Sequence, residues 1–187
     1  ESEWWLIKEI DKKGLIYYGN KVLPYCPRCG TELSANEVGQ GYQEDSVNTI
    51  IVPFKIKDSD TYFLVWTTTP WTLMANVALC VNPDLEYVKV SSMGYKFIVA
   101  KSLANKVLGD DYEVLETYKG TDLVGTKYEQ LMPFVEVEGK CFEVLSDNYV
   151  TSEDGTGIVH IAPAYGEDDN RVCRENGIGF VNPVGKD

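Results

Sequence analysis

The sequence is short of positive charge, of histidine and of long apolar runs. Its 187 residues hold 17 Lys and Arg against 29 Asp and Glu, which gives a formal net charge of -12. Because phosphate contacts need clustered Lys and Arg, this balance argues against a free-standing nucleic-acid-binding protein. It leaves open contact with a nucleic acid that something else holds. No apolar run is long enough to cross a membrane and the N-terminus does not resemble a signal peptide, so we expect no membrane partner.

The spacing of the cysteines and the single histidine provides only half of a recognisable zinc site. Five cysteines, an odd number, are typical of a reducing compartment, and we expect a cytoplasmic protein. Cys26 and Cys29 form a Cys-Pro-Arg-Cys-Gly knuckle, in which two thiolates on a tight turn resemble half of a tetrahedral zinc site. The other cysteines are isolated and His160 is the only histidine. Either the missing ligands lie outside this chain, or the pair binds no metal; a redox pair is a weaker alternative, because no thioredoxin-like strand and helix follow.

Signatures of a catalytic nucleophile are also absent. The sequence has no Gly-x-Ser-x-Gly elbow, no recognisable pairing of cysteine with histidine and no Walker lysine. If the chain is an enzyme, we therefore expect the attacking group to be water, held by hydroxyl, amide and backbone groups.

Short strands dominate the pattern after residue 46. Alternating apolar residues between turn signals predict strands over 50–56, 62–67, 77–81, 86–90, 95–99, 112–117, 141–145, 148–150 and 158–162. Short helices are expected over 70–75, 101–108 and 166–176. Many short strands with few helices favour a closed or strongly curved sheet. The predicted fold class is mainly β with small helices (α+β).

The first 45 residues have a different character. Residues 2–13 mix apolar and charged side chains in a helical pattern that ends at Gly14. Residues 15–18 and 21–23 flank a Gly-Asn turn and predict a hairpin that leads into the cysteine knuckle. We therefore predict a stem at residues 1–45, made of a helix and a hairpin, and a β domain at residues 46–187.

The stretch Trp66–Thr72 places four hydroxyls where a strand ends. Thr67, Thr68 and Thr69 follow an apolar run, and the next residue is a proline that stops the strand. Hydroxyls in such a place bind a polar ligand, cap the following helix or satisfy local backbone groups. Taken alone, the stretch fits a strand end and a helix cap better than a binding site.

Residues 155–169 repeat this layout. A Gly-Thr-Gly loop leads into a short apolar strand that contains His160, a proline ends the strand, and three acidic residues at 167–169 begin a helix. A lone strand histidine is usually structural, and carboxylates in a first helical turn are usually solvated. The functional alternative is an anionic site for an ammonium group, beside a pocket wall formed by the imidazole.

These motifs together resemble the editing insertions, or connective polypeptides, of class I aminoacyl-tRNA synthetases in their isoleucyl version. Trp66–Leu73 followed by Asn76 is similar to the threonine-rich editing signature, although valyl and leucyl relatives typically carry Arg-Pro where this chain has Thr69-Pro70. Gly155–Asp169 is similar to the second editing signature, and Tyr25–Thr31 to the cysteine knuckle of the stem. The similarity covers nearly the whole chain in the right order. One departure is Met74-Ala75, where the family often has Pro followed by Gly, Ala or Ser; it would shift the loop without removing a hydroxyl.

The resemblance implies a distorted β-barrel that hydrolyses the ester of valine mistakenly attached to the isoleucine tRNA. In the family pattern Asp169 holds the ammonium group of the substrate, and His160 lines the side-chain pocket and excludes isoleucine. Thr68 and Thr69 position the ester, the terminal adenosine or the water, with Asn76 in support. Further candidates for substrate contact are Trp66, Thr67, Thr72, Ala162 and Asp168.

The resemblance also implies partners and cofactors. The partners are the 3′ end of the isoleucine tRNA carrying valine, valyl-adenylate as a further substrate, and the remainder of an isoleucyl-tRNA synthetase; the isolated chain is expected to be a monomer. Editing needs no cofactor, zinc at Cys26 and Cys29 belongs to a full-length protein, and ATP belongs to a synthetic domain absent from this chain. Two other classes stay open: an inactive module that binds the tRNA end or docks to a synthetase, and a small zinc-ribbon interaction protein.

Overall fold

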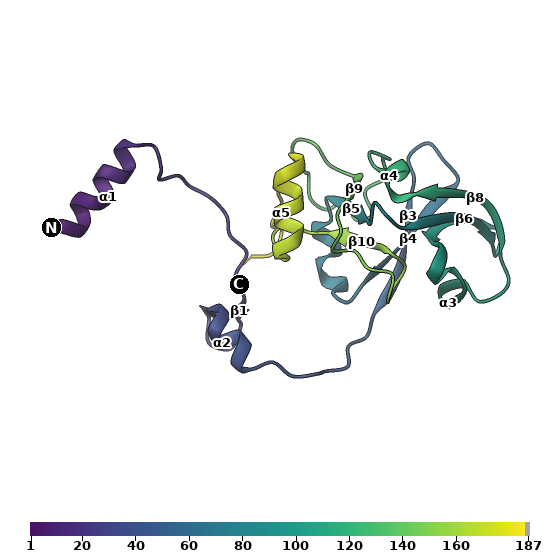
Figure 1. Cartoon of the computed structure of the whole chain (residues 1–187), viewed down its shortest axis with the longest axis horizontal. Coiled ribbons are helices and arrows are strands. Elements are labelled where there is room, and N and C mark those ends of the chain that lie inside the picture. Colours follow the sequence, from purple (N-terminus) through teal and green to yellow (C-terminus); the bar gives the residue numbers. More distant parts are fainter. Residues whose placement is uncertain (186–187) are drawn as a thin grey trace.

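A strongly curled sheet of eight strands forms the body of the molecule (Figure 1). The computed structural model describes residues 1–185. The strand order is β8-β6-β7-β4-β10-β5-β9, and β3 pairs with β4 outside this path. The strands are β3 (Ile50–Lys55), β4 (Thr61–Thr67), β5 (Ala78–Val81), β6 (Glu86–Ser92), β7 (Tyr95–Ala100), β8 (Glu113–Lys119), β9 (Glu143–Ser146) and β10 (Ile158–Ile161).

Short helices join and flank these strands. They are η1 (Pro70–Ala75) and η2 (Lys101–Leu103), which are 3-10 helices, and α3 (Ala104–Leu108), α4 (Gly120–Leu123) and α5 (Glu167–Asn176). The prediction of a mainly β fold with small helices and a curved sheet is confirmed. The segment at 148–150 is wrong as a strand. It forms a turn, because the side chain of Asp147 accepts a hydrogen bond from the backbone N–H of Tyr149 at 3.1 Å.

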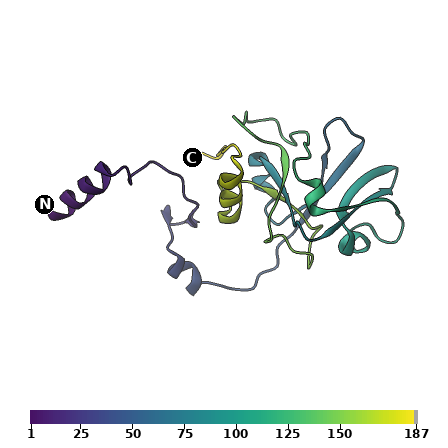
Figure 2. The same ribbon diagram turned by 45° about the horizontal axis from the view of Figure 1, so that its top comes forward.

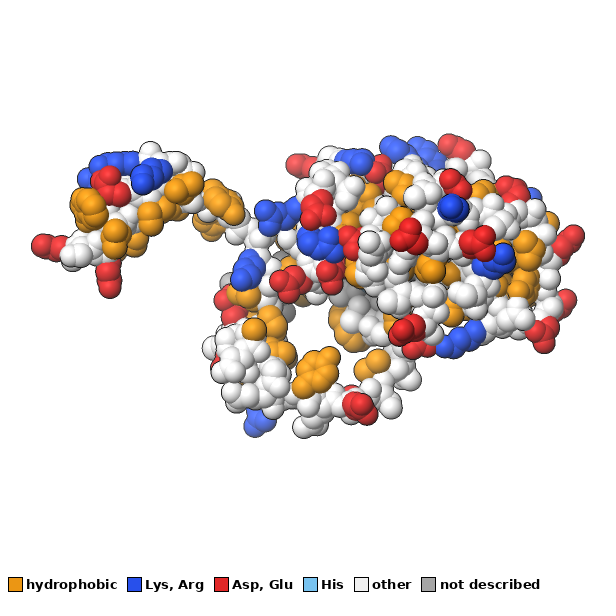
Figure 3. Space-filling view, in the orientation of Figure 1, with side chains coloured by type: hydrophobic (Ala, Val, Ile, Leu, Met, Phe, Trp, Pro, Cys, Tyr) orange, Lys and Arg blue, Asp and Glu red, His pale blue; other side chains and the backbone are white. Residues whose placement is uncertain are grey.

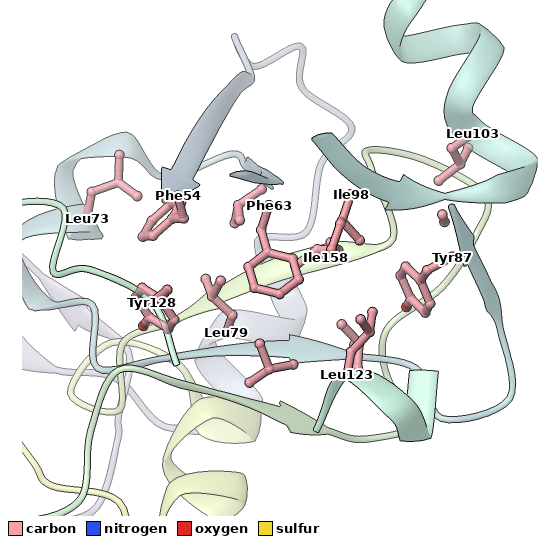
Figure 4. Packing of buried hydrophobic residues seen from close by; sticks show 14 residues of the cluster. Phe54, Phe63, Leu73, Leu79, Tyr87, Ile98, Leu103, Leu123, Tyr128 and Ile158 are labelled. Atoms are coloured by element: carbon pink, nitrogen blue, oxygen red, sulfur yellow. The ribbon is translucent and has the colours of Figure 1, made fainter. Parts of the chain in front are cut away.

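The core lies inside the curl of the sheet (Figure 4). Phe54, Phe63, Tyr87 and Ile158 are fully buried there and come from four different strands. Burying one large apolar side chain contributes about 1.5–3 kcal/mol, so this cluster stabilises the curvature that brings distant strands together.

Two central strands position the candidate site. β10 runs parallel to β4, with Val159 opposite Trp66, and antiparallel to β5. Parallel neighbours end at the same edge of a sheet. The residues that follow Thr67 on β4 and Ile161 on β10 therefore leave the sheet side by side.

The stem contains α1 (Ser2–Lys12), β1 (Tyr25–Cys26), β2 (Thr31–Glu32) and α2 (Ala35–Gln40). The stem helices α1 and α2 lie away from the curled sheet in both ribbon views (Figures 1 and 2), whereas residues 17–22 of the stem line a hollow together with α5. The helix predicted over 2–13 is confirmed. The hairpin predicted over 15–23 is wrong, because that segment has no paired strand; the pairing lies in β1 and β2 instead. The knuckle turn closes that pair, with the N–H of Gly30 bonded to the carbonyl of Cys26 at 2.8 Å.

None of residues 1–49 is buried, and the apolar side chains of α1 lie on the surface (Figure 3). Within residues 1–185, no helix combines the length and apolarity that a membrane span requires. The helix α2 was not predicted, although Ser34 and Glu37 form a capping box that signals a helix start.

Candidate functional site

The two motif stretches form opposite walls of one cleft of about 380 Å³. The segment that runs from β4 into η1 contributes Trp66, Thr67, Thr68, Thr69, Trp71 and Thr72. The segment that runs from β10 into α5 contributes Val159, His160, Ala162, Tyr165, Gly166 and Asp169. The parallel pairing of β4 and β10 explains this meeting, because both chains leave the sheet at the same edge.

The threonine hydroxyls form a connected row along the first wall. The hydroxyls of Thr67 and Thr69 lie 3.4 Å apart, and those of Thr69 and Thr72 lie 3.1 Å apart. The Thr67 hydroxyl also accepts a bond from the Thr69 N–H at 3.0 Å. Pro70 at the start of η1 stops the strand and turns the chain so that Thr72 returns above Thr69. The Thr68 hydroxyl has no hydrogen-bond partner within residues 1–185, so it is free to meet a ligand.

His160 joins the two walls. Its Nε2 lies 3.0 Å from the hydroxyl of Thr72, although the two residues are 88 positions apart in sequence. The side chain is buried, and this burial lowers the pKa of the imidazole to about 4. The ring is therefore neutral at neutral pH, so this wall presents no positive charge to a cationic ligand.

Asp169 supplies the negative charge of the second wall. It stands in the first turn of α5, where its Oδ2 accepts a hydrogen bond from the N–H of Ala162 at 2.9 Å. The hydroxyl of Tyr149 lies 3.5 Å from the other carboxylate oxygen. Burial raises the pKa of Asp169 to about 6, against the opposing effect of the Ala162 bond. A cation entering the cleft would favour the ionised carboxylate and relieve this cost.

Two glycines give these side chains their room. A Cβ at Gly166 would lie 2.9 Å from the carboxylate carbon of Asp169, and a Cβ at Gly155 would lie 2.7 Å from the indole of Trp66. Gly155 also has a φ of +75°. The role of Gly166 was not predicted, and neither was the contact of Tyr149 with Asp169. A glycine directly before an acidic helix start is a usable signal for the first, whereas nothing local marks Tyr149.

Two predicted site residues do not line the cleft. The side chain of Asn76 is buried and donates to the carbonyl of Ala78 at 2.8 Å, while its oxygen accepts from the hydroxyl of Tyr128 at 2.6 Å. It therefore secures the exit from η1. Asp168 is exposed and pairs with Arg171 at 3.2 Å. Adjacent residues in the first turn of a helix point in different directions, so only Asp169 enters the cleft.

The two cysteines of the knuckle lie on one tight turn. The Sγ of Cys26 accepts a bond from the N–H of Cys29 at 3.4 Å, and hydrogen bonds from Cys29 lower the pKa of the Cys26 thiol. In the described part of the chain, no group of three or more Cys, His, Asp or Glu side chains is placed to hold a metal ion. Two thiolates alone do not complete a tetrahedral zinc site, so a zinc ion here would need two further ligands.

Both sequence and fold are similar to those of class I aminoacyl-tRNA synthetases. Residues 1–153 match the model of the tRNA synthetases class I (I, L, M and V). The chain is 50% identical over 188 residues to the isoleucine–tRNA ligase of Clostridium tetani (strain Massachusetts / E88), covering 100% of this chain and 18% of the relative. It is also 50% identical over 185 residues to the isoleucine–tRNA ligase of Bacillus thuringiensis (strain Al Hakam), covering 98% and 18%. This chain thus spans 18% of the length of these curated relatives.

Two solved structures share the fold. The crystal structure of GlLeuRS-CP1 superposes with a TM-score of 0.58 at 19% identity, covering 70% of this chain and 63% of that chain. The editing domain of the P.knowlesi cytosolic leucyl-tRNA synthetase gives a TM-score of 0.58 at 15% identity, covering 69% of this chain and 64% of that chain. The curled sheet described above is therefore the fold of these domains.

Proposed function

We propose that this chain, which belongs to the family of class I tRNA synthetases (I, L, M and V), is an editing domain. It would hydrolyse the ester between valine and a mischarged isoleucine tRNA. The observation that supports this function is a single cleft that combines the Asp169 carboxylate, a row of threonine hydroxyls and a neutral imidazole. Such a cleft suits a substrate with an ammonium group, a small apolar side chain and a polar ester.

The carboxylate of Asp169 would hold the ammonium group. Its pKa of about 6 leaves it mostly ionised at neutral pH, and a bound ammonium would lower that pKa further. The bond from the Ala162 N–H fixes one carboxylate oxygen and leaves the other facing Tyr149 and the cleft. A neutral His160 does not compete for this charge.

Hydrolysis would use water rather than a covalent nucleophile. Water adds to the ester carbonyl, the bond from this carbon to the ribose oxygen breaks, and free valine and uncharged tRNA leave. Thr68, whose hydroxyl has no partner in the described structure, is the hydroxyl best placed to orient the ester or the water. The hydroxyl of Thr69 is held by its neighbours, so it would act as a fixed dipole.

Editing is needed because a synthetic site discriminates poorly between amino acids that differ by one methylene. One methylene is worth only about 1–3 kcal/mol in a hydrophobic pocket, a magnitude for which the isoleucyl enzyme is itself the usual illustration. A second site that excludes the larger side chain removes the error. His160 would form this excluding wall. We expect a His160→Ala variant to cleave isoleucyl-tRNA as well as valyl-tRNA; unchanged discrimination in parallel deacylation assays would remove the wall function from this residue.

The adjacent acids test the ammonium site. We expect Asp169→Ala to lose deacylation of valyl-tRNA by at least about a hundredfold, because an ammonium would meet no counter-charge. Asp168→Ala is the matched comparison, since Asp168 faces Arg171 on the surface, and it should stay within about twofold of the unchanged chain. The assay measures release of labelled valine at high substrate concentration. Binding of the tRNA end without any hydrolysis by the unchanged chain would indicate an inactive binding module instead.

The context of the domain is part of the same proposal. A chain that spans 18% of its relatives fits a segment of a longer synthetase, with residues 1–45 as a stem and residues 46–187 as the editing domain. The remainder of that synthetase would hold the tRNA and bind ATP, which explains how a chain of net charge -12 meets a nucleic acid. A cytoplasmic location, and zinc bound at Cys26 and Cys29 with two ligands from elsewhere, also belong to this proposal.

A further inference from the structure

The hydroxyl of Thr72 has one hydrogen atom and three hydrogen-bonding neighbours. The backbone carbonyl of Thr69 lies 2.8 Å from the Thr72 Oγ1, the hydroxyl of Thr69 lies 3.1 Å away, and Nε2 of His160 lies 3.0 Å away. Only one of these contacts can use the Thr72 hydrogen. The assignment of that hydrogen decides which ring nitrogen of His160 carries a proton.

The Thr72 hydroxyl donates its hydrogen to the backbone carbonyl of Thr69. A carbonyl oxygen only accepts, and two oxygens 2.8 Å apart attract each other only when a hydrogen lies between them. The Thr72 oxygen then has its lone pairs left for the other two neighbours. It accepts from the hydroxyl of Thr69 and from Nε2 of His160, so the imidazole carries its hydrogen on Nε2.

The other ring nitrogen leads to the same assignment. Nδ1 of His160 is buried and has no hydrogen-bond partner within residues 1–185. If the proton were on Nδ1, a buried N–H would be left unpaired, and such orphaned donors are rarer in proteins than under-used acceptors. With the proton on Nε2, the polar hydrogens of the Thr69 hydroxyl, the Thr72 hydroxyl and the His160 ring are all paired, and only the Nδ1 lone pair has no partner.

We propose that Thr72 is a positioning residue, which fixes His160 as the Nε2–H tautomer and so makes the imidazole a hydrogen-bonded wall rather than a general base. The Nε2 hydrogen is engaged by Thr72, and the Nδ1 lone pair is covered by protein, so neither nitrogen can accept a proton from water in the cleft. The tautomer stands on this geometry alone, whereas its role in selecting the substrate rests on the proposed function.

The electrostatic surroundings agree with this assignment. Burial is the only cause that depresses the pKa of His160, to about 4. The other titratable groups that line the same cleft are Asp169 and Tyr165, and neither is hydrogen-bonded to the ring. A neutral ring with a single N–H is therefore the state that Thr72 has to orient.

The test uses the fact that the chain has one histidine. A sample labelled with nitrogen-15 in histidine gives two ring-nitrogen signals, which nuclear magnetic resonance assigns through couplings to the ring carbon-bound hydrogens. We expect one protonated nitrogen, Nε2, and one unprotonated nitrogen, Nδ1, at neutral pH. A protonated Nδ1, or shifts averaged between both tautomers, would overturn the assignment without any need for a variant.

Variants then test the part played by Thr72. Thr72→Val removes the hydroxyl and should shift both nitrogen signals towards averaged values, because Nε2–H loses its acceptor. Thr72→Ser keeps the hydroxyl and should restore the unchanged spectrum. Thr61→Val is the matched control, since Thr61 is also buried but lies at the start of β4, and it should leave the signals unchanged. An unaltered spectrum in a folded Thr72→Val chain would contradict the positioning role.

The same samples separate the two proposals. Deacylation of valyl-tRNA reports the proposed function, and the ring-nitrogen signals report the tautomer. An Nε2–H tautomer that depends on Thr72, in a chain without deacylation, would sustain this inference and end the functional proposal. The reverse result, with deacylation intact and an Nδ1–H ring, would do the opposite. Within an active chain, we also expect Thr72→Val to narrow the preference for valyl over isoleucyl substrate, and Thr72→Ser to restore it.

Discussion

Burial shifts the protonation equilibria of the two titratable residues Asp169 and His160 in this cleft. Asp169 and His160 would carry a negative and a partly positive charge in water at mildly acidic pH. In the cleft, burial raises the pKa of the acid to about 6 and lowers that of the imidazole to about 4. The two shifts separate the groups, so that one charge can be altered by pH while the other stays fixed.

This separation predicts a pH profile. We expect kcat/KM for valyl-tRNA deacylation to fall as the pH drops through about 6, because the ionised carboxylate of Asp169 is the form that pairs with an ammonium group. His160 stays neutral over this interval, since its pKa lies near about 4, and adds no step there. The measurement is initial deacylation rate between about pH 5 and about pH 7.5, corrected for uncatalysed hydrolysis.

The predicted loss of activity at acidic pH can be contradicted directly. A rate that stays flat down to about pH 5 would mean that Asp169 keeps its charge below its own pKa or does not bind the substrate. In the Asp169→Asn variant the residual rate should lose this limb. An Asn side chain keeps an oxygen that can accept the N–H of Ala162, so the variant changes charge with little change of shape.

At the scale of elements, the parallel pair of β4 and β10 creates the cleft. Val159 lies opposite Trp66, and the loop before β10 passes close to the side chain of Trp66 at Gly155. This loop has no side chain at the contact, which lets the two strand ends approach. The pairing of these two elements is therefore sensitive to one added methyl group.

We predict that Gly155→Ala lowers the free energy of unfolding by more than a matched glycine substitution does. A Cβ at Gly155 would lie 2.7 Å from the indole of Trp66 and adopt a φ of +75°. Gly125→Ala is the control, because Gly125 has a φ of +82° but no atom within 4 Å of an added Cβ. Backbone strain of about 1 kcal/mol is common to both variants, and overpacking adds about 1–3 kcal/mol at Gly155 only.

Urea unfolding, followed by tryptophan fluorescence, measures this difference. Equal midpoints for the two variants would show that Trp66 moves away without cost and that the loop does not brace the cleft. A larger loss at Gly155, accompanied by weaker deacylation, would agree with a wall that depends on this approach.

At the scale of the whole molecule, the stem and the body differ in what holds them. The body holds three clusters of buried apolar residues, whereas none of residues 1–49 is buried. Trp4 and Trp5 on α1 are 76% and 61% exposed. Phe54 and Phe63, by contrast, are fully buried in the cluster that Figure 4 shows. The stability of the fold therefore resides in the sheet and its flanking helices.

We predict that a chain of residues 46–187 folds with the same unfolding free energy as the whole chain, within about 0.5 kcal/mol. The reason is that the removed residues bury no side chain, and surface changes of this kind have small effects. Chemical denaturation of both chains, monitored by circular dichroism, makes the comparison. A loss of several kcal/mol would place part of the core in the stem and contradict the predicted boundary.

The sequence by itself determined the fold class, most of the strands and the candidate residues, because those depend on local chemistry; several strand ends differ by one or two residues, as in β6 and β8. Pro70 stops β4 wherever it folds, and alternation of apolar residues makes half-buried strands in any mainly β domain. The resemblance to editing signatures added the roles. Local rules failed at residues 15–23, where a hairpin pattern had no partner surface, and at 148–150, where an Asp side chain favoured a turn.

Only the tertiary structure decided which side chains meet. Thr72 contacts His160 across 88 positions because β4 and β10 pair in parallel, and no local pattern contains that pairing. Asn76 and Asp168 carry suitable chemistry in the right motifs, yet packing turns the first into the core and the second towards Arg171. Burial also set the pKa values of Asp169 and His160, since desolvation depends on what the whole chain places around a group.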